Sequence, residues 1–598
     1  MLLQTIDWVI IVIFFIILLT IGFIASRNAG KSTTNFFLSG RNMPWWLLGT
    51  SMVATTFSCD TPNLVTDIIR QNGVAGNWAW WAFLLTGMLT VFIYAKLWRR
   101  SKVMTDLEFY EIRYSGKMAA FLRGFRALYL GAFFNIVVIA SVSLALIKIG
   151  AVMMDFSATQ TLLIACVVVV FYSTLGGLRS ILLTDFFQFS IAMVGAIGAA
   201  IILIKLPQIN GLDGLISHPD VVPKLNLLPD FSDPSMVWII FILPLAVQWW
   251  SVWYPGAEPG GGGYIAQRML SAKSERNAIG ATLLFNTAHY ALRPWPWIIV
   301  GLASVIVFPD LESIRAAFPN IDPNIIRNDF AYPAMLSFLP NGFLGLVVAS
   351  LFAAFMSTTA SQINWGSSYI VNDFYRRFLK PEATEKELVL VGRISTVVLL
   401  VLAAILALFL SNALQAFNIL LQIGAGTGLI YILRWFWWRI NAYTELTGMV
   451  VSFVIAIYLE VIHPLTGFPA IPQPIKLVAG VAITTASWLL VTFLTRPVDY
   501  PTLRNFFLLT HPGGPGWKKV IEHAEAEGVD LTKGEKDWDV PTGILGMVMG
   551  TLAVYSALFA TGNWIYGRYF WASALSVVCI ICIIAVMRIW FKIKTDPE

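Results

Sequence analysis

The feature that most constrains this chain is the recurrence of apolar stretches long enough to cross a lipid bilayer. An α-helix needs about 20 apolar residues to cross the hydrocarbon core, and fifteen windows of the 598-residue sequence suit such a helix. The composition agrees, because 57% of the residues are hydrophobic and only 12% are charged, more apolar surface than a soluble protein could bury. We therefore predict an all-α polytopic membrane protein with about 15 transmembrane helices. The windows are 6–26, 44–71, 75–98, 119–149, 157–176, 181–205, 236–270, 274–308, 341–376, 386–410, 413–437, 441–462, 475–495, 541–562 and 567–591.

The distribution of Lys and Arg predicts the orientation of the chain. Cytoplasmic loops of membrane proteins are enriched in these residues. With the N-terminus outside, most of the 40 Lys and Arg residues fall in inside loops, and residues 496–540 also lie inside. We therefore expect a protein of the plasma (inner) membrane with an outside N-terminus and a cytoplasmic C-terminus. The formal charge of +6 then belongs to these loops and does not indicate a nucleic-acid partner.

Polar segments and the order of the windows predict the domain organisation. The inserts 207–234 and 310–341 contain several prolines and lie outside in this scheme. All four cysteines lie in apolar segments, so we interpret them, including Cys579 and Cys582, as small buried hydrophobic residues. The predicted parts are an extra N-terminal helix and loop (1–43), a first repeat (44–206), a second repeat with outside loops (207–440), two peripheral helices (441–495), a cytoplasmic loop (496–540) and two C-terminal helices (541–598).

Two of the windows are interrupted by residues that do not suit a continuous helix. The second contains Asp60 and Pro62 among Thr and Ser residues, and the seventh contains WYPGAEPGGGGYIAQRML (253–270). Irregular backbone at membrane depth is tolerated only where it is buried in protein or lines a cavity. Paired interruptions at corresponding positions of two halves are typical of transporter substrate sites. Spans two to six and seven to eleven would form two halves of five spans each. Because five is odd, the second half would cross the membrane in the opposite orientation to the first. A kink that only shapes packing is the alternative.

Four further stretches carry a family resemblance. They are SGRNMPWW, YSTLGGLRSILLTDFFQ, QRMLSAKS and AYPAMLSFLPNGFLGLVVASLFAAFMSTTASQINWGSSYIVNDFY. In these stretches the chain resembles the sodium:solute symporter family, which includes sodium–glucose and sodium–proline symporters, and the likeness runs from about residue 6 to residue 440. The resemblance implies a LeuT-like 5+5 inverted-repeat fold, no enzymatic activity, and Na⁺-driven uptake of a small organic solute by alternating access.

One face of the ninth span is the candidate sodium site. Na⁺ is a hard cation that prefers oxygen ligands, and the ends of broken helices supply carbonyl oxygens in transporters. Ala354, Ser357 and Thr358 lie at i, i+3 and i+4, on one helical face. The resemblance implies that this face binds Na⁺ together with the carbonyl oxygens of Ala54 and Phe57 in the second span. The alternative is that the two hydroxyls bond carbonyls of their own helix.

Asp185, at the start of the sixth span, is a second functional candidate because a carboxylate inside a membrane is energetically expensive. The resemblance implies a place on the sodium exit path, or in a second sodium site that would also use Ser361. A further hydroxyl position of such a site is Ala360 here, so we expect one required sodium ion. The alternative is an interfacial carboxylate paired with Arg179.

The substrate is predicted to bind between the two broken spans. Sugars are bound by planar polar side chains and by an aromatic face stacked on the ring, which makes a sugar the leading expectation. Tyr264 resembles a tyrosine that closes over the sugar in relatives, whereas the Glu and Lys that those relatives carry in spans three and eight are absent. A cation, an amino acid or a carboxylate stays open, and the tryptophans could instead form interface belts. The candidates are Ser58, Asp60, Thr61, Trp80, Trp81, Glu258, Gly262, Tyr264, Tyr290, Arg293 and Gln422.

Three other classes of membrane protein fit the sequence less well. A passive channel or facilitator would need a continuous polar pore rather than a site at the middle of the membrane. A membrane-embedded enzyme would need a cluster such as HExxH, and the five histidines show no such spacing. A sensor would need a fused signalling module. The oligomeric state is left open by the sequence.

Overall fold

The computed structural model describes residues 3–25, 32–56, 58–252, 258–410, 422–532, 538–593 and 595. Within these ranges the chain forms helices and no strands, and Met43 and Ala272 pair in one isolated bridge. Eleven helices in this part of the chain are long and apolar enough to cross a membrane. The other four predicted windows are the broken 44–71 and 236–270, the shorter 157–176, and 413–437, which begins outside the described residues. The fifteen-span count is thus an approximate one.

The helices have the following bounds. The longer ones are α1 (Thr5–Ala25), α3 (Trp45–Thr56), α4 (Asp60–Asn72), α9 (Gly116–Leu128), α10 (Asn135–Met154), α11 (Ala158–Leu203), α16 (Glu275–Thr287), α17 (Pro294–Val307), α20 (Phe343–Ser368), α21 (Glu385–Ala407), α24 (Ala442–Ile457), α25 (Gln473–Leu494), α26 (Tyr500–Thr510), α28 (Val540–Ile565) and α29 (Tyr569–Lys592). The shorter ones are α2 (Thr33–Leu38), α5 (Trp78–Trp81), α6 (Leu84–Leu89), α7 (Ala95–Ser101), α8 (Phe109–Arg113), α12 (Gly211–Ser217), α13 (Pro234–Val237), α14 (Leu243–Ala246), α15 (Gly263–Ser271), α18 (Leu311–Ala317), α19 (Ala331–Leu336), α23 (Gly428–Phe436) and α27 (Lys518–Ala526).

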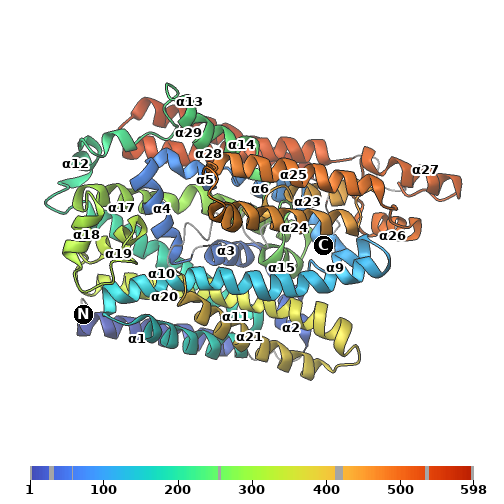
Figure 1. The fold of residues 1–598 in the computed structure, drawn as a ribbon, viewed down its shortest axis with the longest axis horizontal. Helices are drawn as coiled ribbons and strands as arrows, with labels where there is room; N and C mark the ends of the chain where they lie inside the picture. The colour runs from blue at the N-terminus through green and yellow to red at the C-terminus, as the bar shows by residue number, and fades with distance from the viewer. Residues whose placement is uncertain are drawn as a thin grey trace.

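The long helices run roughly side by side along the long axis of the molecule (Figure 1). In that view α25, α28 and α29 lie along one edge, α1 and α21 lie along the opposite edge, and α3 lies between them. The most apolar window of the α20 span is 89% buried, whereas the corresponding windows of α1 and α29 are 28% and 17% buried. The ninth span, which carries the Ser and Thr residues of the candidate sodium face, is therefore enclosed by protein, while the peripheral helices α1 and α29 present apolar side chains outward, as expected of helices in lipid.

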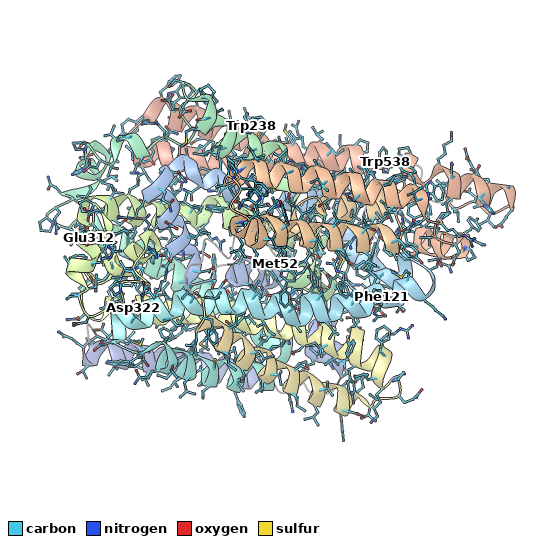
Figure 2. All side chains as sticks on the ribbon, in the orientation of Figure 1. Met52, Phe121, Trp238, Glu312, Asp322 and Trp538 are labelled. Atoms are coloured by element: carbon cyan, nitrogen blue, oxygen red, sulfur yellow. The ribbon has the colours of Figure 1, made fainter. Side chains whose placement is uncertain are left out.

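The two ends of the bundle carry different connecting segments. The N-terminus, α12 and α18 lie at one end of Figure 1, and α26 and α27 lie at the other. Figure 2 agrees, with Glu312 and Asp322 at the first end, Phe121 and Trp538 towards the second, and Met52 near the middle. The two polar inserts and the loop 496–540, which the sequence places on opposite sides of the membrane, thus lie at opposite ends of the molecule.

The break in the second span separates α3 from α4. Asp60 is the first residue of α4, where a carboxylate is favoured by the helix dipole. Pro62 lies in the same first turn, where a missing backbone N–H costs no hydrogen bond. Phe57, between the two helices, is outside the described residues. The end of α3 and the start of α4 therefore bring together, inside the protein, backbone carbonyls and amides that need partners outside their own helices.

The break in the seventh span depends on its run of glycines. Residues 253–257 are outside the described part of the chain, and α15 begins at Gly263. Gly260 and Gly261 have φ values of +86° and +88°, a region that side chains other than glycine rarely adopt. A Cβ atom on Gly262 would lie only 1.7 Å from Oε2 of Glu258. The run is thus explained by backbone conformation and close packing.

The fifth and sixth predicted spans meet at one residue rather than at a loop. The helix α11 is interrupted at Gly177, which has φ 55° and ψ −165°. A Cβ atom there would lie 2.7 Å from the carbonyl oxygen of Phe36 in α2. The tight contact allows α2 to pack against α11 next to the break.

The loop 496–540 contains two helices that pack on the membrane-spanning bundle. The helix α26 packs against α7 and α8. Trp517, just before α27, is fully buried, and its indole N–H donates to the carbonyl of Trp435 at 2.9 Å. Arg113 of α8 lies over the Trp517 ring, 5.2 Å from its centroid. The described part of this segment therefore packs against α7, α8 and α23 of the bundle.

Candidate functional site

A cavity of about 150 Å³ lies beside the break between α3 and α4. Its other walls come from α5 and the turn after it, from α10, from the segment between α16 and α17, and from α20. Six of the eleven substrate residues predicted from the sequence line it, namely Ser58, Asp60, Thr61, Trp80, Tyr290 and Arg293. The remaining lining residues are Thr55, Thr56, Leu64, Val65, Phe83, Val138, Ser141, Val142, His289, Thr358 and Gln362.

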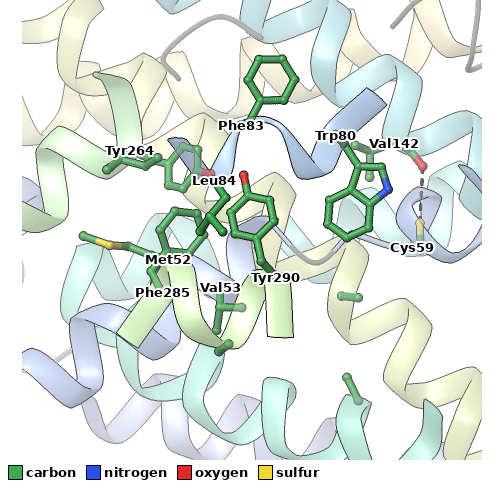
Figure 3. Close-up of a cluster of buried hydrophobic side chains, with 14 of the residues drawn as sticks. Met52, Val53, Cys59, Trp80, Phe83, Leu84, Val142, Tyr264, Phe285 and Tyr290 are labelled. Carbon is green, nitrogen blue, oxygen red and sulfur yellow. Dashed lines mark hydrogen bonds between the residues drawn. The ribbon is translucent and has the colours of Figure 1, made fainter. Parts of the chain in front are cut away.

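An aromatic pair forms one wall of this cavity. The rings of Trp80 and Tyr290 are nearly parallel, with an interplanar angle of 23° and centroids 5.8 Å apart. The Trp80 indole N–H donates to the side-chain oxygen of Asn77 at 2.8 Å, which fixes the orientation of the ring. Figure 3 shows Trp80 and Tyr290 with Phe83 nearby. The cavity thus offers rigid aromatic faces to a bound molecule.

One carboxylate and one guanidinium share the same cavity. Asp60 is half-buried at the start of α4, whereas Arg293 is only 1% exposed. Arg293 is hydrogen-bonded to His289, and its Nη1 donates to the carbonyl of Val53 at 3.3 Å. Its guanidinium carbon lies 5.3 Å from the centroid of the Trp297 ring. The arginine is therefore held in one orientation by contacts within the protein.

The two hydroxyls of the candidate sodium face bond two different helices, Thr358 the end of α3 and Ser357 the helix α11. Thr358 Oγ1 donates to the carbonyl oxygen of Thr55 at 2.7 Å, and Ser357 Oγ donates to Oδ1 of Asp185 at 2.7 Å. Ala54 and Ala354 are each 2% exposed. Neither hydroxyl bonds a carbonyl of its own helix in these contacts, and both retain lone pairs for a cation. The position of Phe57 lies outside the described residues.

Asp185 is fully buried inside the protein. Its Oδ2 accepts a hydrogen bond from Ser51 Oγ at 2.5 Å and lies 4.0 Å from the Nη2 atom of Arg268. Arg179, the alternative partner considered from the sequence, is exposed. Ser361 accepts from Arg268 at 2.6 Å, so the two residues proposed for a second sodium share one arginine.

The other predicted substrate residues lie outside the cavity lining. Trp81 is buried against Phe559, with ring centroids 5.9 Å apart. Gln422 donates to the carbonyl of Lys476 at 3.2 Å, and Glu258 and Gly262 pack against each other in the seventh span. Tyr264 is adjacent to the cavity, because its hydroxyl is hydrogen-bonded to the lining residue Thr56 at 2.7 Å.

Ten lining residues were not among the sequence candidates, and His289, Gln362, Phe83 and Ser141 are four of them. His289 precedes Tyr290 and lies one helical turn before Arg293, and Gln362 lies one turn after Thr358 on α20. Helical spacing from residues already singled out could have indicated both of them. Phe83 lies three residues after Trp80, so the same spacing could have indicated it, whereas Ser141 has no such local signal, because only the packing of α10 brings it to the cavity.

A second buried cluster contains four charged residues and a tyrosine. Arg126 Nη2 lies 2.5 Å from Oε1 of Glu258, and its Nη1 donates to the Tyr431 hydroxyl at 2.7 Å. Glu445 lies 3.7 Å from both Arg126 and Arg434. All four charged side chains are at most 3% exposed. A buried network of this kind locks the segments that carry it, namely α9, the seventh span, α23 and α24.

The sequence matches one family of known proteins over most of its length. A sequence model of the Sodium:solute symporter family matches residues 36–452. A sodium/glucose cotransporter of Vibrio parahaemolyticus is 27% identical over 478 residues, which are 77% of this chain and 86% of that protein. A sodium/myo-inositol cotransporter 2 of Oryctolagus cuniculus is 26% identical over 556 residues, 86% and 78% of the two chains. A sodium/mannose cotransporter of Bos taurus is 27% identical over 498 residues, 77% and 80% of the two chains.

A solved structure shows the same fold. The substrate-bound outward-open state of a Na⁺-coupled sialic acid symporter matches with a TM-score of 0.65 and 19% identity, over 83% of this chain and 99% of that chain. The predicted all-α, LeuT-like fold is thereby confirmed.

Proposed function

This chain belongs to the Sodium:solute symporter family and is a Na⁺-coupled symporter of a small polar organic solute, and we propose that the solute is a neutral sugar or polyol. It is a transporter and not an enzyme. The observation that carries the proposal is the nearly parallel Trp80–Tyr290 pair in a cavity whose lining combines apolar side chains with hydroxyl, amide and charged groups. The three relatives are cotransporters of glucose, myo-inositol and mannose, and each of these solutes has a ring with several hydroxyls.

The chemistry of the lining suits a ring with apolar faces and polar edges. Aromatic faces bury the C–H surface of such a ring, and a few well-placed polar groups fix its orientation. Ser58, Thr61 and Gln362 supply hydroxyl and amide groups, and Asp60 can accept two hydrogen bonds from neighbouring hydroxyls. Because Asp60 and Arg293 contribute opposite charges, the pair favours a neutral solute over an ion.

An acidic sugar is the second candidate, and Arg293 is the observation that favours it. A buried guanidinium is well suited to bind a carboxylate with two hydrogen bonds. Arg293 is, however, already bonded to His289 and to the Val53 carbonyl. A carboxylate would have to replace those contacts, so the neutral solute remains the stronger proposal.

We assign Na⁺ to the carbonyl oxygens of Ala54, Phe57 and Ala354 and the hydroxyls of Ser357 and Thr358. The support is that Thr358 lines the solute cavity and also bonds the carbonyl of Thr55 at the end of α3. A cation bound there would order the end of α3, which forms part of the cavity wall. Ion and solute would then favour the same arrangement of this helix, as coupled transport requires.

The proposed orientation places the α26–α27 end in the cytoplasm and the N-terminus, α12 and α18 outside, in the plasma membrane. The Lys and Arg bias of the loops supports this assignment. The buried cluster of Arg126, Glu258, Glu445 and Arg434 would then close the path between the cavity and the cytoplasm. Alternating access requires this network to open when the solute is released.

The test is uptake by the purified protein in liposomes with an inward Na⁺ or K⁺ gradient. Radiolabelled glucose, mannose, myo-inositol, an acidic sugar, an amino acid and a quaternary amine serve as solutes. We expect accumulation of at least one neutral sugar or polyol with Na⁺ and not with K⁺. Accumulation of the acidic sugar alone, lost in Arg293→Gln, would establish the second candidate. Na⁺-dependent accumulation of only the amino acid or amine would refute both sugar proposals.

A further inference from the structure

A shell of buried oxygen atoms surrounds Asp185 next to the solute cavity. Ser51 on α3 and Ser357 on α20 donate to its two carboxylate oxygens, at 2.5 and 2.7 Å. Ser361, one turn further along α20, is hydrogen-bonded to Thr55 Oγ1 at 2.8 Å. Carboxylate and hydroxyl oxygens are the ligands that a hard cation prefers. The shell therefore has the composition of a second cation site.

The guanidinium of Arg268 occupies this shell. Its Nη2 donates to Ser361 Oγ at 2.6 Å and to Ser51 Oγ at 3.2 Å, and lies 4.0 Å from Oδ2 of Asp185. Arg268 and Asp185 have no exposed surface. The arginine thus provides the positive charge that a buried carboxylate needs.

Further contacts hold the arginine in this position. Gln267 Oε1 accepts from Nη1 of Arg268 at 2.8 Å, and the Tyr264 ring centroid lies 5.7 Å from the guanidinium carbon. Gln267 is anchored in turn, because its amide donates to the Phe37 carbonyl and to Asn364 Oδ1, both at 3.0 Å. The guanidinium is therefore placed by a connected set of side chains on α15 and its neighbours.

We propose that Arg268 is a tethered cation that takes the place of a second sodium ion at Asp185, so that the symporter moves one Na⁺ with each solute. This inference rests on the proposed function above. The charge of Asp185 is balanced by a cation that cannot dissociate, and a fixed positive charge in the shell repels a second mobile one. Ala360, one turn after Ser357, adds no hydroxyl oxygen to the shell.

The first experiment measures radioactive sodium and labelled solute taken up together, which gives the ratio of sodium to solute whatever the charge of the solute. We expect a ratio of one for the wild type. Removing the tether and adding a hydroxyl, in Arg268→Gln/Ala360→Ser, should raise the ratio to two. The matched control, Arg268→Lys/Ala360→Ser, keeps the positive charge and should keep the ratio at one. A wild-type ratio of two that falls to one in Asp185→Asn overturns the proposal, as does a ratio of one in a transporting Arg268→Gln/Ala360→Ser variant.

The second experiment does not depend on that variant folding. Asp185→Asn leaves Arg268 buried without its counter-charge and should lower the uptake rate at least tenfold, in line with the penalty for an unpaired buried charge. The neutral double variant Asp185→Asn/Arg268→Gln should recover uptake and thermal stability relative to both single variants, with the ratio still one. A double variant no better than its worse parent overturns the proposal. If no solute accumulates with Na⁺ in the wild type, the proposed function is refuted instead. If uptake is driven by Na⁺ but the ratio of sodium to solute is two in the wild type and in the variants, only the tethered-cation proposal is refuted.

Discussion

Removing the hydroxyls of Ser357 and Thr358 should raise the sodium concentration that half-activates uptake. Both side chains are almost completely buried, at 1% and 5% exposure. Their hydroxyls make 2.7 Å hydrogen bonds that hold α20 to α11 and to the end of α3. Because solvent does not reach the site freely, water is a poor replacement for a lost ligand. The variants Ser357→Ala and Thr358→Val each remove one oxygen from the proposed ion shell.

The size of the effect follows from the energy of a polar contact with a charged group. Such contacts contribute about 1.5–3 kcal/mol, and about 1.4 kcal/mol corresponds to a factor of ten in affinity. Each single substitution should therefore raise the half-activating sodium concentration by roughly 10- to 140-fold. The two residues are neighbours on one site, so the effect of the double variant should differ from the product of the single effects.

The assay is the initial rate of solute uptake into liposomes as a function of external Na⁺, with choline keeping the ionic strength constant. Thr358→Ser retains the hydroxyl and should stay close to the wild type. Thr282→Val is the matched control, because Thr282 is 1% exposed and bonds the Ala278 carbonyl of its own helix at 2.9 Å. Unchanged sodium activation in a folded Ser357→Ala/Thr358→Val variant would refute the ion-site assignment.

Three further predictions follow from the same contacts. Asp185→Asn should slow transport but leave the half-saturating solute concentration at the outside face nearly unchanged, because Asp185 contacts Ser357 and does not line the cavity. Initial uptake rates over a range of solute concentrations check this, and a rise in the half-saturating concentration as large as the fall in rate would contradict it. Trp80→Ala should weaken solute binding by roughly 2- to 12-fold more than Trp80→Phe, since an aromatic pair adds about 0.5–1.5 kcal/mol. Equal solute affinities of the two variants in a binding titration would show that the Trp80 ring does not contact the solute. Gly262→Ala should lower the melting temperature, because its Cβ would lie 1.7 Å from Oε2 of Glu258 and would displace that side chain from its ion pair with Arg126. Breaking a buried ion pair costs about 3–5 kcal/mol. Gly195→Ala, whose Cβ would lie 3.1 Å from Ser350 Oγ, is the control, and equal melting temperatures for the two variants would contradict the argument.

The fold could be predicted well from the sequence because the bilayer imposes a length and a polarity on every span. The breaks at residues 54–63 and 253–270 were also visible, since Pro, Gly and Asp are unusual inside apolar windows. The solute cavity lies beside the first of these breaks, so Ser58, Asp60 and Thr61 could be identified from their neighbours in sequence alone.

The partners of buried charges could not be predicted in the same way. Glu258 was a candidate for substrate because it is a carboxylate in a broken span, but its partner is Arg126, 132 residues earlier in the chain. Asp185 was compared with nearby Arg179, whereas the guanidinium beside it comes from Arg268 on α15. Such pairs are set by which helix faces meet in three dimensions, and no local pattern records that.

Thr358 belongs both to the wall of the solute cavity and to the contact with the end of α3. Because binding energies are linked, any factor by which Na⁺ tightens solute binding is also the factor by which solute tightens Na⁺ binding. Inhibitors should likewise differ in how strongly their binding depends on Na⁺. A compound that contacts only the Trp80–Tyr290 pair would bind equally well with or without Na⁺, whereas one that reaches Thr358 would bind more tightly when Na⁺ is present. The sodium dependence of an inhibitor would thus report how deeply it enters the cavity.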